Sequence, residues 1–297
     1  MIERVNIHPE LNALLRLLDD PDERVATEVE KRILKYGESA LAPLNAFPAA
    51  SDANTFVALD DLYKERAARL TGVIAAERFL HELQPLTTAS QTAGDDAHRD
   101  VNLESAVCAL ARFAYPFFDK AQLDEQLSSL ARRLQIRLQH GMTHGEVMKT
   151  IIDFFVCEEY FTGNNGDYYN PDNSYINMVL ETRKGIPISL SVVWLLVVRR
   201  LNLPFSGVNL PGHFLLKYEI STVDIYIDPY AGGKLLSRLD CIRFMSNAGY
   251  QFSERHLAPA DNRQIFVRML NNLFEIYSQR DGTFRSTVLK QAIDSLL

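Results

Sequence analysis

Apolar residues recur at intervals of three and four through most of the first 160 residues. Such spacing places side chains on one face of a helix. In residues 8–47 the pattern occurs twice, separated by the sequence Asp19-Asp20-Pro21-Asp22, which stops one helix and starts the next. We therefore expect a helical pair there, one or two helices over 53–83, and more over 101–160.

Polar and turn-forming residues separate these helical stretches from one another. Residues 84–100 are polar and rich in Pro, Gly, Ser and Thr, which is typical of a linker. The Gly/Asn/Asp-rich segment 162–174 predicts a structured loop. Beyond it, the pattern predicts a helix over 175–183, an apolar helix over 187–201, and two helices from residue 262 that are separated near 281–282.

Segment 213–229 alternates apolar and polar residues, which predicts two antiparallel strands joined by a turn. Directly opposed residues in such a pair share a face of the sheet. We place the centre of the turn at the bond between residues 220 and 221, either as a tight turn or as a longer loop, because this register gives one wholly apolar face. The register pairs Phe214 with Ile227, Leu216 with Ile225, Tyr218 with Val223, Lys217 with Asp224, and His213 with Asp228.

Composition indicates a soluble globular protein, with 47% apolar and 23% charged residues among 297. A net charge of -7 without a basic cluster disfavours a nucleic-acid partner. No apolar run approaches the roughly 18 residues that cross a bilayer, so we expect no membrane partner. Three widely spaced cysteines favour a reducing, cytoplasmic location and form no metal-ligand spacing, and neither a metal nor another cofactor is expected.

His213 and Asp228 are the candidate catalytic residues, since a carboxylate beside an imidazole fixes its tautomer and supports a general base. A nucleophile would then be presented by the start of the helix at Pro187. Ser189 lies two residues into that helix, but the intervening rotation of about 200° turns it away from the direction that position 187 faces. Cys157 is a second candidate for a relocated nucleophile. A structural pair that only staples two strands remains the alternative.

Four motifs in the second half of the chain carry a resemblance to a known family. The motifs are Phe161-Thr162-Gly163-Asn164, Tyr168-Tyr169-Asn170-Pro171-Asp172-Asn173-Ser174-Tyr175, Arg183-Lys184-Gly185-Ile186-Pro187-Ile188-Ser189-Leu190 and Pro211-Gly212-His213-Phe214. With these motifs the chain resembles the SirB-type transglutaminase-like proteins of bacteria, whose core module also occurs in a eukaryotic F-box protein.

The resemblance implies an α+β fold. We expect a mainly helical N-terminal region with a HEAT-like unit (1–83), a linker (84–100), a papain/transglutaminase-like core with a small antiparallel sheet (101–257), and a tetratricopeptide-like helical pair (258–297). It also implies that His213 and Asp228 are the superfamily's catalytic pair. Pro187 stands where that superfamily has its nucleophilic cysteine.

The expected function is therefore that of a non-catalytic, regulatory protein that binds a peptide or another protein. Its binding residues would include Tyr168, Tyr169, Asn173 and Ser174, although these could instead only brace their loop. An amide-acting hydrolase or acyltransferase that uses Ser189 or Cys157 is the alternative, so whether the protein is an enzyme stays open. A purely structural scaffold, the third possibility, predicts no open groove at His213.

Overall fold

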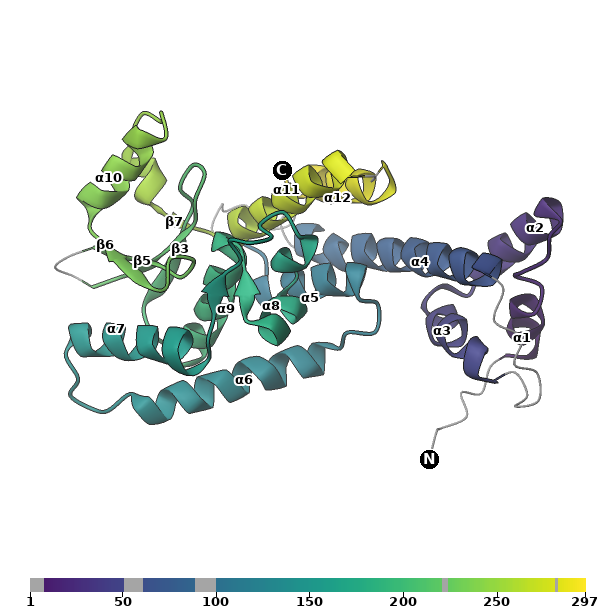
Figure 1. Cartoon of the computed structure of the whole chain (residues 1–297), viewed down its shortest axis with the longest axis horizontal. Coiled ribbons are helices and arrows are strands. Elements are labelled where there is room, and N and C mark those ends of the chain that lie inside the picture. Colours follow the sequence, from purple (N-terminus) through teal and green to yellow (C-terminus); the bar gives the residue numbers. More distant parts are fainter. Residues whose placement is uncertain (1–7, 51–60, 89–99, 221–223, 281–282) are drawn as a thin grey trace. The chain divides into compact units, whose positions relative to one another are not determined.

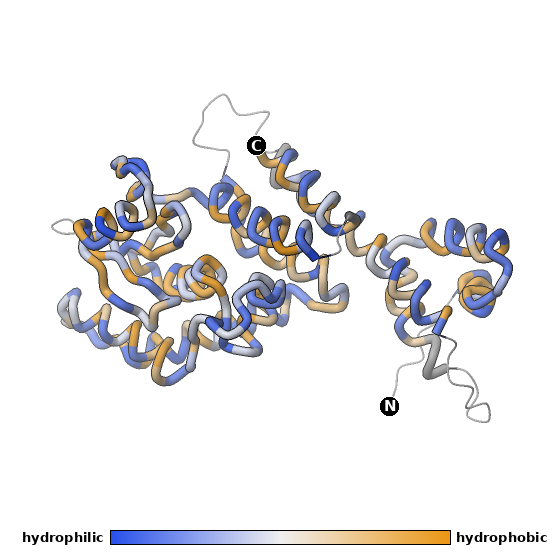
Figure 2. The backbone as a smooth tube through the Cα atoms, turned by 45° about the horizontal axis from the view of Figure 1, so that its top comes forward, coloured by the Kyte–Doolittle hydropathy of each residue, from blue (hydrophilic) through white to orange (hydrophobic). Residues whose placement is uncertain are grey.

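The computed structural model describes residues 8–50, 61–88, 100–220, 224–280 and 283–297. The chain forms two compact units. The first comprises residues 1–82 with 112–117, and the second comprises residues 83–111 with 118–297. Figure 2 shows hydrophobic and hydrophilic positions interleaved along the helices of both units, as amphipathic helices around a core require.

The first unit consists of helices α1 (Pro9–Leu15), α2 (Glu23–Leu34), α3 (Leu41–Ala50) and most of α4 (Asp61–Thr88). The predicted break between the first two helices is confirmed, because the Asp22 side chain caps α2 by accepting a hydrogen bond from the Arg24 amide. Apolar side chains from all four helices form one buried core, which includes Leu15, Ile33, Leu44 and Ile74.

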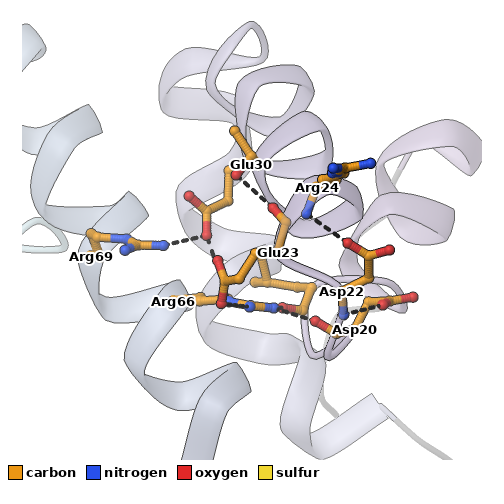
Figure 3. A network of polar contacts seen from close by, with 9 residues as sticks. Asp20, Asp22, Glu23, Arg24, Glu30, Arg66 and Arg69 are labelled. Carbon is orange, nitrogen blue, oxygen red and sulfur yellow. Dashed lines mark hydrogen bonds and ion pairs between the residues drawn. The ribbon is translucent and has the colours of Figure 1, made fainter.

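Arg66 of α4 is buried and forms hydrogen bonds to the turn between α1 and α2 (Figure 3). Arg66 is 3% exposed and donates to the carbonyl oxygens of Leu18 and Asp20, each at 2.8 Å. Its guanidinium also forms an ion pair with Glu23 at 2.9 Å. A buried guanidinium needs such partners to offset its lost hydration. The network therefore has a structural role.

The second unit is built around one apolar helix, α9 (Pro187–Arg200). Its central residue Trp194 is fully buried and stacks on Phe155, with ring centroids 4.4 Å apart. The predicted apolar helix is thus confirmed as core. The other helices are α5 (Leu103–Ala114), α6 (Lys120–Arg137), α7 (His144–Asp153), which a π-helical turn (Phe154–Glu158) extends, α8 (Ile176–Thr182), α10 (Arg238–Asn247), α11 (Asn262–Arg280) and α12 (Thr283–Leu296).

A small antiparallel sheet packs against this helix. Its strands are β3 (Phe205–Val208), β4 (Leu215–Tyr218), β5 (Ile225–Asp228), β6 (Lys234–Leu236) and β7 (Pro259–Ala260), in the order β6-β5-β4-β3-β7. Contacts of α9 with β3 and β4 join the helix to the sheet. Figure 1 shows α9 and α10 on different sides of these strands. The expected α+β class is confirmed.

The predicted register of the hairpin is wrong by two residues. Leu216 lies opposite Ile227, and Lys217 opposite Tyr226. A shift of two residues leaves every side chain on the same face of the sheet, so alternation alone cannot distinguish the two registers. The predicted pair of Lys217 and Asp224 becomes a diagonal one, and the two side chains still form an ion pair at 2.9 Å.

The loop ahead of α8 is structured, as its composition predicts. Strand β1 (Thr162–Gly163) pairs in parallel with β2 (Lys184–Gly185), and a 3-10 helix follows at Pro171–Ser174. The expected linker 84–100 overlaps the end of α4, while its residues 89–99 lie outside the described part of the chain. Helix α4 continues past Pro85 to Thr88.

The C-terminal helices belong to the second unit. Helix α11 packs on α12, on α9 and on the 3-10 helix of the loop. Over the described residues, no helix combines the length and the apolar character that crossing a membrane requires.

Candidate functional site

The sheet brings His213 and Asp228 into direct contact. His213 Nε2 lies 2.7 Å from Asp228 Oδ2, a hydrogen-bonding distance. Asp228 ends β5, whereas His213 precedes β4 and follows Gly212, whose φ of +73° favours glycine. In the observed register the two side chains are diagonal neighbours on one face of the sheet, rather than directly opposed.

The second oxygen of Asp228 fixes the turn after β5. Oδ1 accepts hydrogen bonds from the main-chain amides of Tyr230 at 3.0 Å and Ala231 at 3.1 Å. Both carboxylate oxygens are therefore engaged, and the side chain is only 11% exposed. The carboxylate thus orients the His213 ring and at the same time stabilises the local backbone.

A hollow of about 300 Å³ opens beside this pair. It lies between the sheet and α10, on the sheet face to which Leu215 and Tyr226 also point. Its lining combines apolar side chains with charged ones, among them Leu210, His213, Asp228, Lys234, Asp240, Cys241, Arg243 and Phe244. The scaffold interpretation does not require such a hollow at His213.

Cys241 is the thiol that lines the hollow. Its side chain is fully buried in the apolar cluster under α10. Burial raises the pKa of the Cys241 thiol to about 11, and the charge of Asp240 acts in the same direction. The thiol is therefore protonated at neutral pH, whereas nucleophilic attack requires the thiolate.

Pro187 is the first residue of α9, and the Ser189 side chain forms hydrogen bonds at the N-terminus of this helix. The Ser189 hydroxyl accepts from the Ile186 amide at 3.1 Å and donates to the Asn173 carbonyl at 2.5 Å. It is 2% exposed. Among the hydrogen bonds of the described residues, the side-chain partner of His213 is Asp228, and neither Ser189 nor Cys157 is brought to it. Cys157 is exposed on the π-helical turn.

Of the predicted binding residues, Asn173 braces its loop. The Asn173 amide donates to the carbonyls of Asp167 at 2.6 Å and Tyr168 at 3.1 Å, and its oxygen accepts from Asn164. Asn173 and Ser174 are 4% and 1% exposed, so neither side chain presents itself at the surface.

Tyr168 and Tyr169 are exposed and belong to a row of five rings. Tyr169 contacts Tyr168 at 5.3 Å between centroids, and Tyr168 contacts Tyr230 at 6.0 Å. Tyr230 in turn lies 6.4 Å from His213, and His213 lies 5.3 Å from Phe244 of α10. Four segments that are distant in the sequence thus supply one aromatic row, which we call the ring row.

Tyr230 and Phe244 were not among the site residues predicted from the sequence. Tyr230 follows Asp228 by two residues, so its position after the second strand was an available signal. Phe244 had none, because its proximity to His213 depends on how α10 packs against the sheet. Burial, and then the charge of Asp228, raise the pKa of the Tyr230 hydroxyl, which donates to Asn165 at 2.7 Å.

A second hollow, of about 280 Å³, lies at the other end of the ring row. Tyr168, Tyr169 and Ile186 form one side, and α11 contributes Asn272, Glu275, Ile276 and Gln279. In the described ranges, no group of three or more His, Cys, Asp or Glu side chains is arranged so that it could hold a metal ion.

Comparison with known proteins agrees with this architecture. A UPF0162 protein of Xylella fastidiosa (strain Temecula1) is 33% identical over 208 residues, which cover 67% of this chain and 72% of that protein. F-box only protein 21 of Mus musculus is 36% identical over 146 residues, or 46% of this chain and 23% of that protein. No solved structure matches the chain.

The family comparison covers the site itself. Residues 121–271 match the family described as the transglutaminase-like superfamily, and this range includes His213, Asp228 and the start of α9. Together with the similarity to the Xylella protein, the match shows that the chain belongs to the transglutaminase-like superfamily.

Proposed function

We propose that this protein is a non-catalytic member of its superfamily that binds a peptide or a protein segment beside His213. In this proposal Pro187 occupies the position of the superfamily's cysteine. Proline suits the first position of a helix, where its missing N–H is no loss, but it has no nucleophilic atom. The groove would then retain recognition without acyl transfer.

The observation that carries the proposal is the arrangement of acid, base and hydroxyl groups. An oriented imidazole opens onto a hollow, while the hydroxyl of Ser189 is buried and bound to the main chain. A serine nucleophile must instead lie within about 3 Å of its base. Cys241 lines the same hollow, but its raised pKa keeps the thiol protonated.

The alternative, an amide-acting hydrolase or acyltransferase with a relocated nucleophile, is tested by covalent trapping. We would incubate the full chain with a peptidyl vinyl sulfone and follow adduct formation by intact-protein mass spectrometry. The exposed Cys157 should react at the rate of an ordinary free thiol. That rate should be the same in His213→Ala and in the control His140→Ala, which changes an exposed histidine.

A fall in labelling of tenfold or more in His213→Ala, with His140→Ala unchanged, would show that His213 activates a nucleophile. The non-catalytic proposal would then be wrong. Peptide mapping of the adduct would identify the residue that acts in place of a helix-terminal cysteine.

A further inference from the structure

The ring row connects the two hollows, which suggests one continuous binding surface rather than two isolated sites. Tyr169 and Phe244, at its two ends, are 66% and 39% exposed. Exposed aromatic side chains supply large contact area at little entropic cost and are enriched at recognition surfaces. In the described part of the chain, these rings pack against one another from one hollow to the next.

The spacing of the rings suits an extended peptide. Successive centroids are 5.3 to 6.4 Å apart. In an extended chain, side chains on one face recur every two residues, or about 6.6 Å. A segment that alternates apolar and polar residues can therefore place an apolar side chain near each ring and leave its polar side chains in water.

The charges at the His213 hollow favour an acidic residue. Asp228 uses both carboxylate oxygens, and Asp240 Oδ2 accepts from the amide and the hydroxyl of Ser237 at 2.9 and 2.6 Å. Lys234 is exposed at the same hollow, and its ammonium group forms no ion pair with a described residue. Arg243, which also lines the hollow, is instead paired with Asp240 Oδ1 at 3.7 Å.

The hollow at the opposite end differs in charge. Its exposed charged residue is Glu275, accompanied by the neutral amides of Asn272 and Gln279. The surface thus has the cation of Lys234 at one end and the anion of Glu275 at the other, and this polarity gives a bound segment one preferred direction.

We infer that the ring row binds an extended peptide segment with alternating apolar residues and an Asp or Glu side chain that pairs with Lys234. This inference rests on the proposed function and adds the chemistry of the partner. A single-stranded nucleic acid could also stack on aromatic rings, but Glu275 and a net charge of -7 oppose a polyanion.

The test is selection of a displayed library of random 12-residue peptides on the immobilised full chain, followed by anisotropy measurements with the synthesised peptides. We expect alternating apolar positions with an Asp or Glu near one end. Lys234→Glu should weaken binding of these peptides about tenfold, because it replaces an attraction by a repulsion. Repeating the selection on Lys234→Glu should enrich Lys or Arg at the same position.

Lys290→Glu is the matched control, because Lys290 is exposed on α12 and pairs with Asp294. It should leave binding unchanged, and equal melting temperatures would show that both variants are folded. Tyr169→Ser should weaken binding without altering the preference for an acid. Peptides selected without an acidic residue, or bound equally by Lys234→Glu, would overturn the inference while leaving peptide binding itself intact.

Two further outcomes have distinct meanings. Recovery of no binding peptide would overturn the proposed function together with the inference. Binding of a labelled 20-nucleotide oligouridine that is lost in Tyr169→Ser would assign the ring row to nucleic acid and would also overturn the inference.

Discussion

Replacement of Asp228 by alanine tests whether this carboxylate holds the site together. The change removes the bond to His213 and leaves the amides of Tyr230 and Ala231 without their acceptor. A hydrogen bond to a charged group contributes about 1.5–3 kcal/mol. Water can reach the two amides in part, since Ala231 is exposed. We therefore expect Asp228→Ala to lower the free energy of unfolding by about 3 kcal/mol.

Urea unfolding followed by the fluorescence of Trp194 measures this loss. Trp194 is the chain's single tryptophan and is buried in the second unit, so its signal reports on the unit that contains the site. Asp228→Asn keeps one acceptor oxygen for the turn and should lose about half as much. Asp294→Ala, which breaks an exposed pair on α12, should cost about 0.5 kcal/mol or less.

A double-mutant cycle isolates the contribution of the contact between His213 and Asp228. The coupling energy between His213→Ala and Asp228→Ala should be about 1–2 kcal/mol. If Asp228→Ala destabilised the second unit no more than Asp294→Ala does, or if the coupling energy were zero, the assignment of Asp228 as the residue that orients His213 and the following turn would be wrong.

Three further predictions concern the neighbourhood of the hollow. Gly233→Ala should lower the melting temperature more than Gly232→Ala: both glycines have positive φ, but only at Gly233 would the added Cβ lie 2.6 Å from Ile152. A thiol reagent should modify the exposed Cys157 in the native protein and the buried Cys241 only after unfolding, which quantitative labelling with and without urea would check. The folded-state pKa of Cys241 is about 11 against an ordinary 9.0, so the stability that the protonated thiol contributes is complete below pH 9 and is lost as the pH rises towards 11. Between these values the free energy of unfolding should fall by up to about 1.4 kcal/mol per pH unit, and by less in Cys241→Ala. Equal slopes of unfolding free energy against pH in both proteins would contradict this attribution.

The sequence alone determined the parts of the fold that depend on local pattern. The apolar run from Pro187 predicted a buried helix because polar residues bound it at both ends, and the alternation over 213–229 predicted two strands because its period is two. The motifs around Gly163, Gly185 and His213 indicated the superfamily, since each combines residues that local structure by itself does not require. The juxtaposition of an imidazole and a carboxylate also followed, because both candidate registers place them on one face.

Tertiary structure decided what depends on the packing of distant segments. The hairpin shifted by two residues, which an alternating pattern cannot detect, since only the turn and the neighbouring strands distinguish registers of equal parity. The Ser189 hydroxyl donates a hydrogen bond to the carbonyl of Asn173, sixteen residues away, a contact that only the fold creates. The ring row and the hollow at His213 arise where α10 and the loop before α8 approach the sheet. The hollow is lined by residues within 210–247, and the ring row adds Tyr168 and Tyr169 from an earlier loop, but no periodicity in the sequence connects these positions.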